Sequence, residues 1–312
     1  MTYAMLFPGQ GSQSVGMLQA LPYPEIRQTF DAASDALGWD LTGLVRDGPE
    51  AQLNQTARTQ PALLAAGIAL WRVWQQTSPP APAALAGHSL GEYTALVAAG
   101  ALDFADALRL VALRGELMQN AVPEGEGGMI AVIGLDDAAV EALCADCPVD
   151  AVLSPVNYNA PGQVVVAGAQ AALAWLEANG KAAGARMLVR LPVSVPSHCA
   201  LMRGAAERLA ERLAETTIGA CHIPVIHNVD GRPRSDAAAV REALAAQLYQ
   251  PVRWTASIGH LQDIGVQRYI ECGPGKVLAG LNKRIVKGVD VFALEEQGAL
   301  DAARAAIGAA AV

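Results

Sequence analysis

The stretch ALAGHSLGEYTALVAAG, from Ala84 to Gly100, places a serine between two glycines where a short apolar run gives way to a helical pattern. Its centre, Gly87 to Gly91, satisfies the pattern G-x-S-x-G. Small residues must flank the serine if a strand turns sharply into a helix, because Cβ atoms have no room there. The stretch therefore predicts strand, turn and helix with Ser89 exposed at the turn, although the same pattern also fits a serine that only caps the helix.

Apolar runs and helical patterns alternate on both sides of this stretch. Residues 3–7 form an apolar run, and helical patterns cover residues 25–37, 61–76 and 104–122. Such alternation is typical of an α/β fold with a mainly parallel sheet.

The rhythm changes after EGEGG at residues 124–128. The order then becomes strand, helix, strand, strand, helix, strand, which is the split βαβ order of a ferredoxin-like unit. The earlier style resumes near residue 192. We therefore predict a large α/β domain from residues 1–127 and 192–312, with an inserted α+β domain from residues 128–191.

Composition excludes several classes of function. The chain has 312 residues, 52% of them hydrophobic, so it can bury a sizeable core. With a net charge of -8, the chain lacks the excess of basic residues that nucleic-acid-binding proteins have. Its first residues lack the pattern of a signal peptide, and no apolar run reaches the roughly 18 residues of a membrane span. We expect a soluble, cytoplasmic protein with no nucleic-acid or membrane partner, acting as a monomer.

The five cysteines fit a reducing compartment, since their number is odd and the chain is too long to need disulfides. The one C-x-x-C motif, Cys144 to Cys147, has no second pair and no histidine at zinc spacing. We expect no metal.

A nucleophilic serine needs a base, and the pattern around His198 favours it over the other histidines. The segment RLPVSVPSHCALMRGAAERL leads from an apolar run through two prolines into an amphipathic helix. His198 is therefore expected at a strand-to-helix junction, as Ser89 is, and such junctions share the carboxyl edge of an open α/β sheet. A helix start there would disfavour the imidazolium ion. The alternative is a polar residue near a helix start that Ser197 caps.

Arg114 lies on an apolar helical stripe. Leu110, Leu113, Arg114 and Leu117 follow the spacing i, i+3, i+4, i+7. A buried arginine needs a partner. That partner is either a carboxylate of the protein or a carboxylate of the substrate, which the guanidinium can grip with two parallel hydrogen bonds.

Two glycine-rich stretches do not fit nucleotide sites. In FPGQGSQSVG, Ser14 stands where a dinucleotide fingerprint needs its third glycine, so the loop fits better as a donor of backbone amides to an oxyanion. Around ECGPGKVL, Ile270 just before the stretch and Val277 within it stand where a phosphate-binding loop needs glycine and a hydroxyl residue. We expect no nucleotide cofactor.

Together, eight ordered stretches resemble one family over nearly the whole chain, the malonyl-CoA:acyl carrier protein transacylases of fatty-acid synthesis. The stretches are FPGQGSQ (7–13), TQPALL (59–64), GHSLGEY (87–93), LRGELMQ (113–119), SPVNYNAPGQVVVAG (154–168), LPVSVPSHCALM (191–202), QLYQPVRW (247–254) and ECGPGKVL (271–278). The resemblance implies a hydrolase-like, parallel-sheet α/β domain with an inserted ferredoxin-like domain.

The resemblance also implies roles for single residues. Ser89 matches the nucleophile and His198 its general base, which later acts as the acid toward the leaving thiol. The backbone amides of Gln10 and Leu90 match the oxyanion hole. The backbone carbonyl of Gln247 matches the group that holds the second nitrogen of the histidine.

Other matched positions concern the substrates. Arg114 matches the clamp on the free carboxylate of malonate, while Gln60 and Asn157 match positions that line the site. The implied reaction moves malonyl from malonyl-CoA to the phosphopantetheine thiol of acyl carrier protein through a malonyl-serine ester, in two steps and without a cofactor.

Carrier proteins of this system are acidic, so a basic surface is expected to receive them. The candidate residues lie in GLNKRIVKG and before His198, and they are Lys283, Arg284, Lys287, Arg186 and Arg190. The alternative is that these side chains form an ordinary solvated surface.

Three rival functions stay open. The malonyl transferase subunit of malonate decarboxylase shares the catalytic motifs and differs in its carrier, although the contexts of TQPALL and QLYQPVRW favour the fatty-acid enzyme. A serine esterase would not need an arginine on the apolar stripe. A non-catalytic carrier-binding protein would not need Ser89, His198 and Arg114 together.

Overall fold

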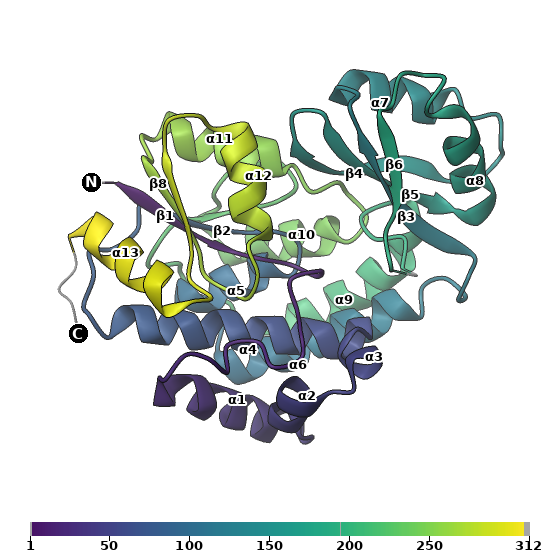
Figure 1. Cartoon of the computed structure of the whole chain (residues 1–312). Coiled ribbons are helices and arrows are strands. Elements are labelled where there is room, and N and C mark those ends of the chain that lie inside the picture. The colour runs from purple at the N-terminus through teal and green to yellow at the C-terminus, as the bar shows by residue number, and fades with distance from the viewer. Residues whose placement is uncertain (1, 194, 309–312) are drawn as a thin grey trace.

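The computed structural model describes residues 2–193 and 195–308, whose strands form one sheet of five and one of four. The two sheets lie in separate lobes, the smaller lobe at the upper right of Figure 1. Neighbouring strands of the five-stranded sheet are all parallel, in the order β7-β2-β1-β8-β9. These strands are β1 (Tyr3–Phe7), β2 (Ala84–Gly87), β7 (Val225–Ile226), β8 (Arg268–Glu271) and β9 (Asp290–Ala293).

The central strand β1 is buried on both faces. Tyr3, Met5 and Phe7 point into one hydrophobic core, while Ala4 and Leu6 point into another on the opposite face. A parallel strand covered on both sides must be apolar at every position. For this reason the strand is visible in the sequence as an uninterrupted apolar run, and the predicted α/β fold with a parallel sheet is confirmed.

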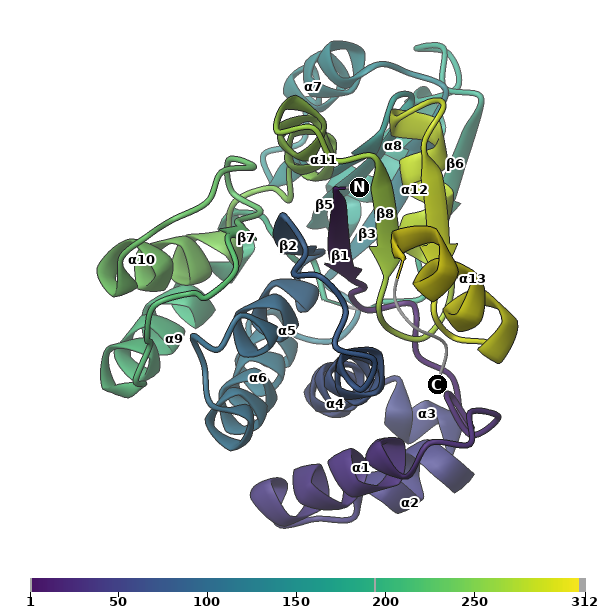
Figure 2. The ribbon, with the colours of Figure 1, turned by 90° about the vertical axis from the view of Figure 1, so that its left-hand side faces the viewer.

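Helices cover both faces of the sheet, as Figure 2 shows. On one face lie α11 (Trp254–Asp263) and α12 (Val277–Ile285). The opposite face carries the larger core. The helices that contribute to that core are α1 (Pro24–Leu37), α2 (Leu41–Asp47), α3 (Glu50–Leu53), α4 (Thr56–Gln75), α5 (Gly91–Ala98), α6 (Phe104–Gln119), α9 (Arg203–Glu215), α10 (Ala237–Gln247) and α13 (Gln297–Ile307).

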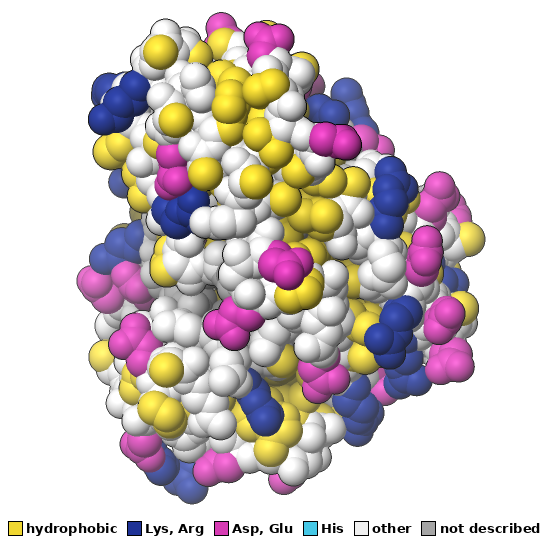
Figure 3. Space-filling view, turned by 90° about the vertical axis from the view of Figure 1, so that its right-hand side faces the viewer, with side chains coloured by type: hydrophobic (Ala, Val, Ile, Leu, Met, Phe, Trp, Pro, Cys, Tyr) yellow, Lys and Arg dark blue, Asp and Glu magenta, His cyan; other side chains and the backbone are white. Residues whose placement is uncertain are grey.

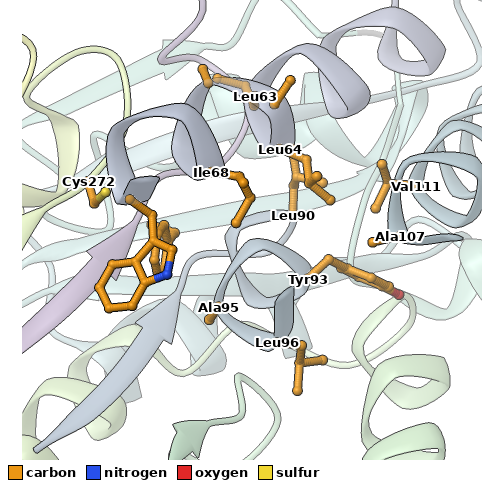
Figure 4. Packing of buried hydrophobic residues seen from close by; sticks show 14 of the residues in the cluster. Leu63, Leu64, Ile68, Leu90, Tyr93, Ala95, Leu96, Ala107, Val111 and Cys272 are labelled. Carbon is orange, nitrogen blue, oxygen red and sulfur yellow. The ribbon is translucent and has the colours of Figure 1, made fainter. Parts of the chain in front are cut away.

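Helix α5 is packed between α4 and α6. Leu64 and Ile68 of α4 lie beside Leu90 from the turn before α5, whereas Tyr93 of α5 itself points toward α6 (Figure 4). All four side chains have at most 2% of their surface exposed. The helix that follows Ser89 is therefore fixed by close packing on two sides.

The smaller sheet is antiparallel, with the strand order β4-β5-β3-β6 that defines a ferredoxin-like unit. Two helices cover one face, and the other face packs onto Cys199 and Leu201 of the chain that follows. The elements are β3 (Gly127–Ile133), α7 (Asp137–Ala145), β4 (Leu153–Ala160), β5 (Gln163–Ala169), α8 (Gln170–Asn179) and β6 (Met187–Arg190). The predicted second unit of the fold is thus confirmed.

Strand β4 joins the two lobes. The amide of Tyr158 donates to the carbonyl of Val252 at 2.9 Å, and the amide of Val252 donates to the carbonyl of Val156 at 2.8 Å. The smaller lobe is therefore attached to the larger one beside the carboxyl end of the parallel sheet. Within the described residues, none of the helices combines the length and the apolar character needed to cross a membrane.

Candidate active site

Ser89 lies on a sharp turn between β2 and α5, as the sequence predicts. Its φ of 51° is in the left-handed region, which costs a residue with a side chain about 1–3 kcal/mol. A Cβ added to Gly87 would lie 1.9 Å from the carbonyl carbon of Gly91, and one added to Gly91 would lie 2.0 Å from the carbonyl oxygen of Phe7. Only glycine on both sides lets the turn pack against β1, so these glycines place Ser89.

His198 and Ser89 meet directly. His198 Nε2 lies 2.9 Å from Ser89 Oγ, and its Nδ1 lies 2.6 Å from the backbone carbonyl oxygen of Gln247. Because a carbonyl only accepts, Nδ1 carries the proton and Nε2 is free to accept the serine proton. The arrangement is that of a nucleophile with an oriented base.

The environment of His198 keeps the imidazole neutral. Burial, and secondly the charge of Arg114, lower the pKa of His198 to about 3. The expected cause was a helix that starts at His198. Instead, α9 begins only at Arg203, and a short 3-10 helix (Ala200–Met202) precedes it. The expected route was also wrong: the strand before His198 is β6 of the antiparallel sheet, so His198 reaches Ser89 from the connection between the lobes.

Arg114 of α6 is fully buried beside the nucleophile. Its Nη1 donates to Gln60 Oε1 at 2.7 Å, and its Nη2 donates to Gln247 Oε1 at 2.8 Å and to Ser89 Oγ at 3.1 Å. These acceptors are all neutral, Nε has no hydrogen-bond partner, and none of the described carboxylates forms an ion pair with Arg114. A buried cation without an adjacent counter-charge is costly, so the site is suited to an incoming carboxylate.

Two backbone amides next to Ser89 have no acceptor. Neither the amide of Gln10 nor that of Leu90 donates a hydrogen bond to any described residue. The loop that carries Gln10 lies against the turn, because a Cβ added to Gly9 would come within 2.5 Å of the carbonyl oxygen of His88. Free amides at this position are suited to stabilise an oxyanion on a carbonyl attacked by Ser89.

Asn157 lies on β4 above the turn and is only 8% exposed. Its Oδ1 has no hydrogen-bond partner among the described residues. Two residues along the strand, Asn159 Oδ1 lies 2.8 Å from His88 Nε2. His88 is thus held by the smaller lobe, and it is His198 that contacts Ser89 Oγ.

Sequence reasoning missed a polar cluster beneath the turn, formed by Glu92, His227 and Asn228. Asn228 Oδ1 accepts from the amide of Ser89 at 2.7 Å, and its Nδ2 donates to the carbonyl of Gly87 at 2.7 Å. One signal could have found Asn228: it follows β7, the parallel neighbour of β2, and thus lies at the same carboxyl edge.

The five basic residues expected to receive a carrier do not all lie on one surface. Lys283 and Arg284 end α12, and Arg284 contacts Gln163 and the carbonyl of Pro161 in the smaller lobe. Lys287 follows α12, and Arg186 precedes β6; both side chains lie at the surface. Arg190 instead turns toward α8, where it pairs with Glu177 at 2.8 Å.

The described residues form neither a cluster suited to a metal ion nor a disulfide. No group of three or more His, Cys, Asp or Glu residues within 2–193 and 195–308 could hold a metal ion. All five cysteines are free thiols.

Comparison with known proteins agrees with this geometry. The family model of the acyl transferase domain matches residues 4–304. A malonyl CoA-acyl carrier protein transacylase of Salmonella typhimurium is 56% identical over 303 residues, which are 96% of this chain and 98% of that protein.

Solved structures lead to the same family. The crystal structure of an acyl carrier protein S-malonyltransferase from Vibrio cholerae has a TM-score of 0.94 at 55% identity, covering 97% of this chain and 100% of that one. A malonyl-transacylase solved in complex with a type II PKS acyl-carrier protein has a TM-score of 0.95 at 51% identity, covering 97% and 99%. The chain therefore belongs to the acyl transferase domain family and, within it, to the malonyl CoA-acyl carrier protein transacylases.

Proposed function

We propose that the protein transfers the malonyl group of malonyl-CoA to the phosphopantetheine thiol of acyl carrier protein, through a malonyl ester on Ser89. The observation that carries the proposal is Arg114, a buried cation with only neutral partners that donates to the nucleophile itself. A neutral acyl group offers no counter-charge to such a cation. The names of the relatives support the same reaction.

In the first half-reaction, Ser89 attacks the thioester carbon of malonyl-CoA while His198 Nε2 takes the hydroxyl proton. The negative charge moves to the former carbonyl oxygen, where the amides of Gln10 and Leu90 donate to it. One such donor is typically worth about 3–4 kcal/mol in the transition state. The intermediate then expels the CoA sulfur, which receives the proton from His198, and leaves the malonyl-serine ester.

In the second half-reaction the roles are reversed. The thiol of the carrier gives its proton to His198 and attacks the ester carbon, and Ser89 leaves with the proton that His198 returns. Two bulky thiols thus use one pocket in turn, since the acyl group stays on the protein between the two steps.

Arg114 holds the free carboxylate of the malonyl group with two parallel hydrogen bonds. Gln60 orients the guanidinium from one side and Gln247 from the other. Asn157 has an unused oxygen near the site and is assigned to an amide N–H of the pantetheine arm of the substrate. No cofactor enters either step, and every group comes from one chain, so we assign the activity to the monomer.

The carrier docks on the basic residues Lys283, Arg284, Lys287 and Arg186, of which Arg284 contacts Gln163 and Pro161 of the smaller lobe. Arg190 is left out because Glu177 neutralises its charge. On the face shown in Figure 3, basic side chains are scattered among acidic ones. With a net charge of -8, the chain can attract an acidic partner only through such a local surface. The free cysteine thiols agree with action in a reducing cytoplasm.

Intact-mass measurement after mixing with malonyl-CoA, and separately with acetyl-CoA, tests the proposal. The expected result is a malonyl adduct that disappears on adding acyl carrier protein, and that never forms in Ser89→Ala. Ser257→Ala is the matched control, since Ser257 is also a buried serine but lies on α11. Absence of the adduct in the unmodified protein, or its persistence in Ser89→Ala, would reject the proposal.

A further inference from the structure

Glu92 is a fully buried carboxylate one helical turn after the nucleophile. It accepts three hydrogen bonds. The donors are His227 Nδ1 at 2.7 Å, the backbone amide of Asn228 at 2.9 Å and Gln247 Nε2 at 2.8 Å. The reaction described above does not use this carboxylate, although burying it is costly.

The bond to Glu92 fixes which way the side-chain amide of Gln247 points. A carboxylate only accepts, so it must face the NH2 group of the amide. The oxygen of the amide then faces the opposite way and accepts from Arg114 Nη2. If the amide were flipped, its oxygen would face Glu92 and its NH2 group would face the guanidinium, which only donates. Glu92 and Arg114 therefore select one orientation together, with the amide dipole between the two charges.

The same NH2 group reaches the nucleophile turn. Gln247 Nε2 donates to the backbone carbonyl oxygen of Ser89 at 3.0 Å. That carbonyl belongs to the peptide group whose N–H is the amide of Leu90, one of the two free donors. A hydrogen bond to the oxygen fixes the plane of the peptide and polarises its N–H. The orientation of Gln247 thus bears on the carboxylate clamp and on the oxyanion donor at once.

We propose that Glu92 is a positioning residue for the transfer: by orienting the side-chain amide of Gln247, it aligns both Arg114 and the Ser89–Leu90 peptide. This inference rests on the proposed function. It assigns a role in the reaction to a residue that touches neither substrate nor Ser89 Oγ.

Glu92→Gln removes the charge with little change in shape. The oxygen of the new amide can accept from Asn228 and Gln247, while its NH2 group donates to His227 Nδ1 once that ring moves its proton to Nε2. His227 Nε2 has no partner in the described structure, so the second tautomer breaks no hydrogen bond there. The variant therefore keeps the contacts and weakens the charge-assisted bond that orients Gln247.

The test measures single-turnover acylation of Ser89 by malonyl-CoA and by acetyl-CoA. Glu92→Gln should lower the saturating rate at least about tenfold with both thioesters, less than the full loss of an oxyanion donor. It should also lower the preference for malonyl over acetyl several-fold. When Arg114→Ala is already present, Glu92→Gln should no longer change the preference for malonyl over acetyl, because that effect acts through Arg114. It should still lower the acylation rate, because that effect does not act through Arg114.

Glu271→Gln is the matched control. Glu271 is also a fully buried carboxylate, but it accepts from the backbone amides of Leu278 and Ala279 on α12. Both variants are compared by thermal unfolding and near-UV circular dichroism. If Glu92→Gln does not fold, Glu92→Asp replaces it, since a carboxylate drawn back by one methylene also releases Gln247.

The inference is overturned if the folded variant acylates Ser89 at a rate within about twofold of that of the Glu271→Gln control. It is also overturned if the preference for malonyl over acetyl is unchanged. The unmodified protein is run alongside. Its failure to form the malonyl ester would reject the proposed function itself, whereas normal acylation with an unaffected variant would reject only the role of Glu92.

Discussion

Ser89 and His198 both have left-handed backbone conformations, with φ of 51° and 65°. Each is held there by a backbone hydrogen bond: the amide of Ser89 donates to Asn228, and the amide of His198 donates to the carbonyl of Leu248 at 2.9 Å. Residues keep such strained conformations only where the surroundings fix them strongly. Ser89 and His198 are therefore aligned before the substrate binds. The ionisation state of His198 is also set before the substrate binds.

The low pKa of His198 predicts the pH dependence of acylation. With a pKa of about 3, the imidazole of the free protein is already neutral at pH 5, so acylation should not fall between pH 7 and pH 5 through this group. In Arg114→Ala the second cause of the shift is gone, and the pKa should rise. The kcat/KM for acetyl-CoA, measured between pH 4 and pH 8, should then show its acid limb at a higher pH in the variant. An unchanged profile would contradict this electrostatic effect.

Arg114 should decide which acyl group is accepted. Arg114→Ala should lower kcat/KM for malonyl-CoA by about 100-fold, the loss expected for a buried charge-assisted pair, and affect acetyl-CoA far less. Arg109→Ala is the control, because Arg109 lies on the same helix but pairs with Asp106 at the surface. Equal losses with the two thioesters would mean that Arg114 supports the site without selecting the substrate.

At the level of elements, the sequence predicts what depends on local pattern. β1 and β2 are evident as apolar runs, and α6 is evident from its apolar stripe. The helices α2 and α3 were not predicted, since 7 and 4 residues give too little periodicity. β9 has exposed or half-buried residues at three of its four positions, so it lacks the apolar signal of a central strand.

The sequence does not predict the contacts that distant segments of the chain make at the site. Ser89, His198 and Arg114 were found because their motifs are local. The bonds from Glu92 to His227 and Asn228 join residues 135 and 136 positions apart, and no local pattern encodes such a contact. The fold had to bring β7 beside β2 before the role of Asn228 could be seen.

The attachment of α12 to β8 should depend on pH through Glu271, which accepts from the first amides of that helix. Burial raises the pKa of Glu271 to about 7 from its ordinary 4.5. Between these pH values the folded state binds more protons than the unfolded state, so the free energy of unfolding falls as pH rises from about 4.5 to about 7.

Glu271→Gln removes this dependence. Relative to the variant, the unmodified protein should lose roughly 2–3 kcal/mol of stability between pH 4.5 and pH 8. Urea unfolding of both proteins across that range measures the difference. A gap that is constant with pH, or that changes in the opposite sense, would show that Glu271 stays ionised in the folded protein.

At the scale of the whole molecule, the site lies where two lobes of different architecture meet. The larger lobe supplies Ser89, Arg114 and Gln247, while β4 of the smaller lobe reaches over the turn with Asn157 and Asn159. Arg284 of α12 contacts the loop between β4 and β5, so the basic end of α12 is tied to the strand that covers the site.

Charge reversal should separate docking of the carrier from the chemistry. Lys283→Glu combined with Arg284→Glu should raise the KM for acyl carrier protein about tenfold and leave the KM for malonyl-CoA unchanged, since attraction between exposed charges acts on the encounter. The effect should shrink as salt rises from 0.05 to about 0.5 M, because exposed charges are screened. Arg27→Glu is the control: Arg27 is equally basic, has 86% of its side chain exposed, and lies on α1. If both KM values rise together, or if Arg27→Glu has the same effect, the end of α12 is not where the carrier binds.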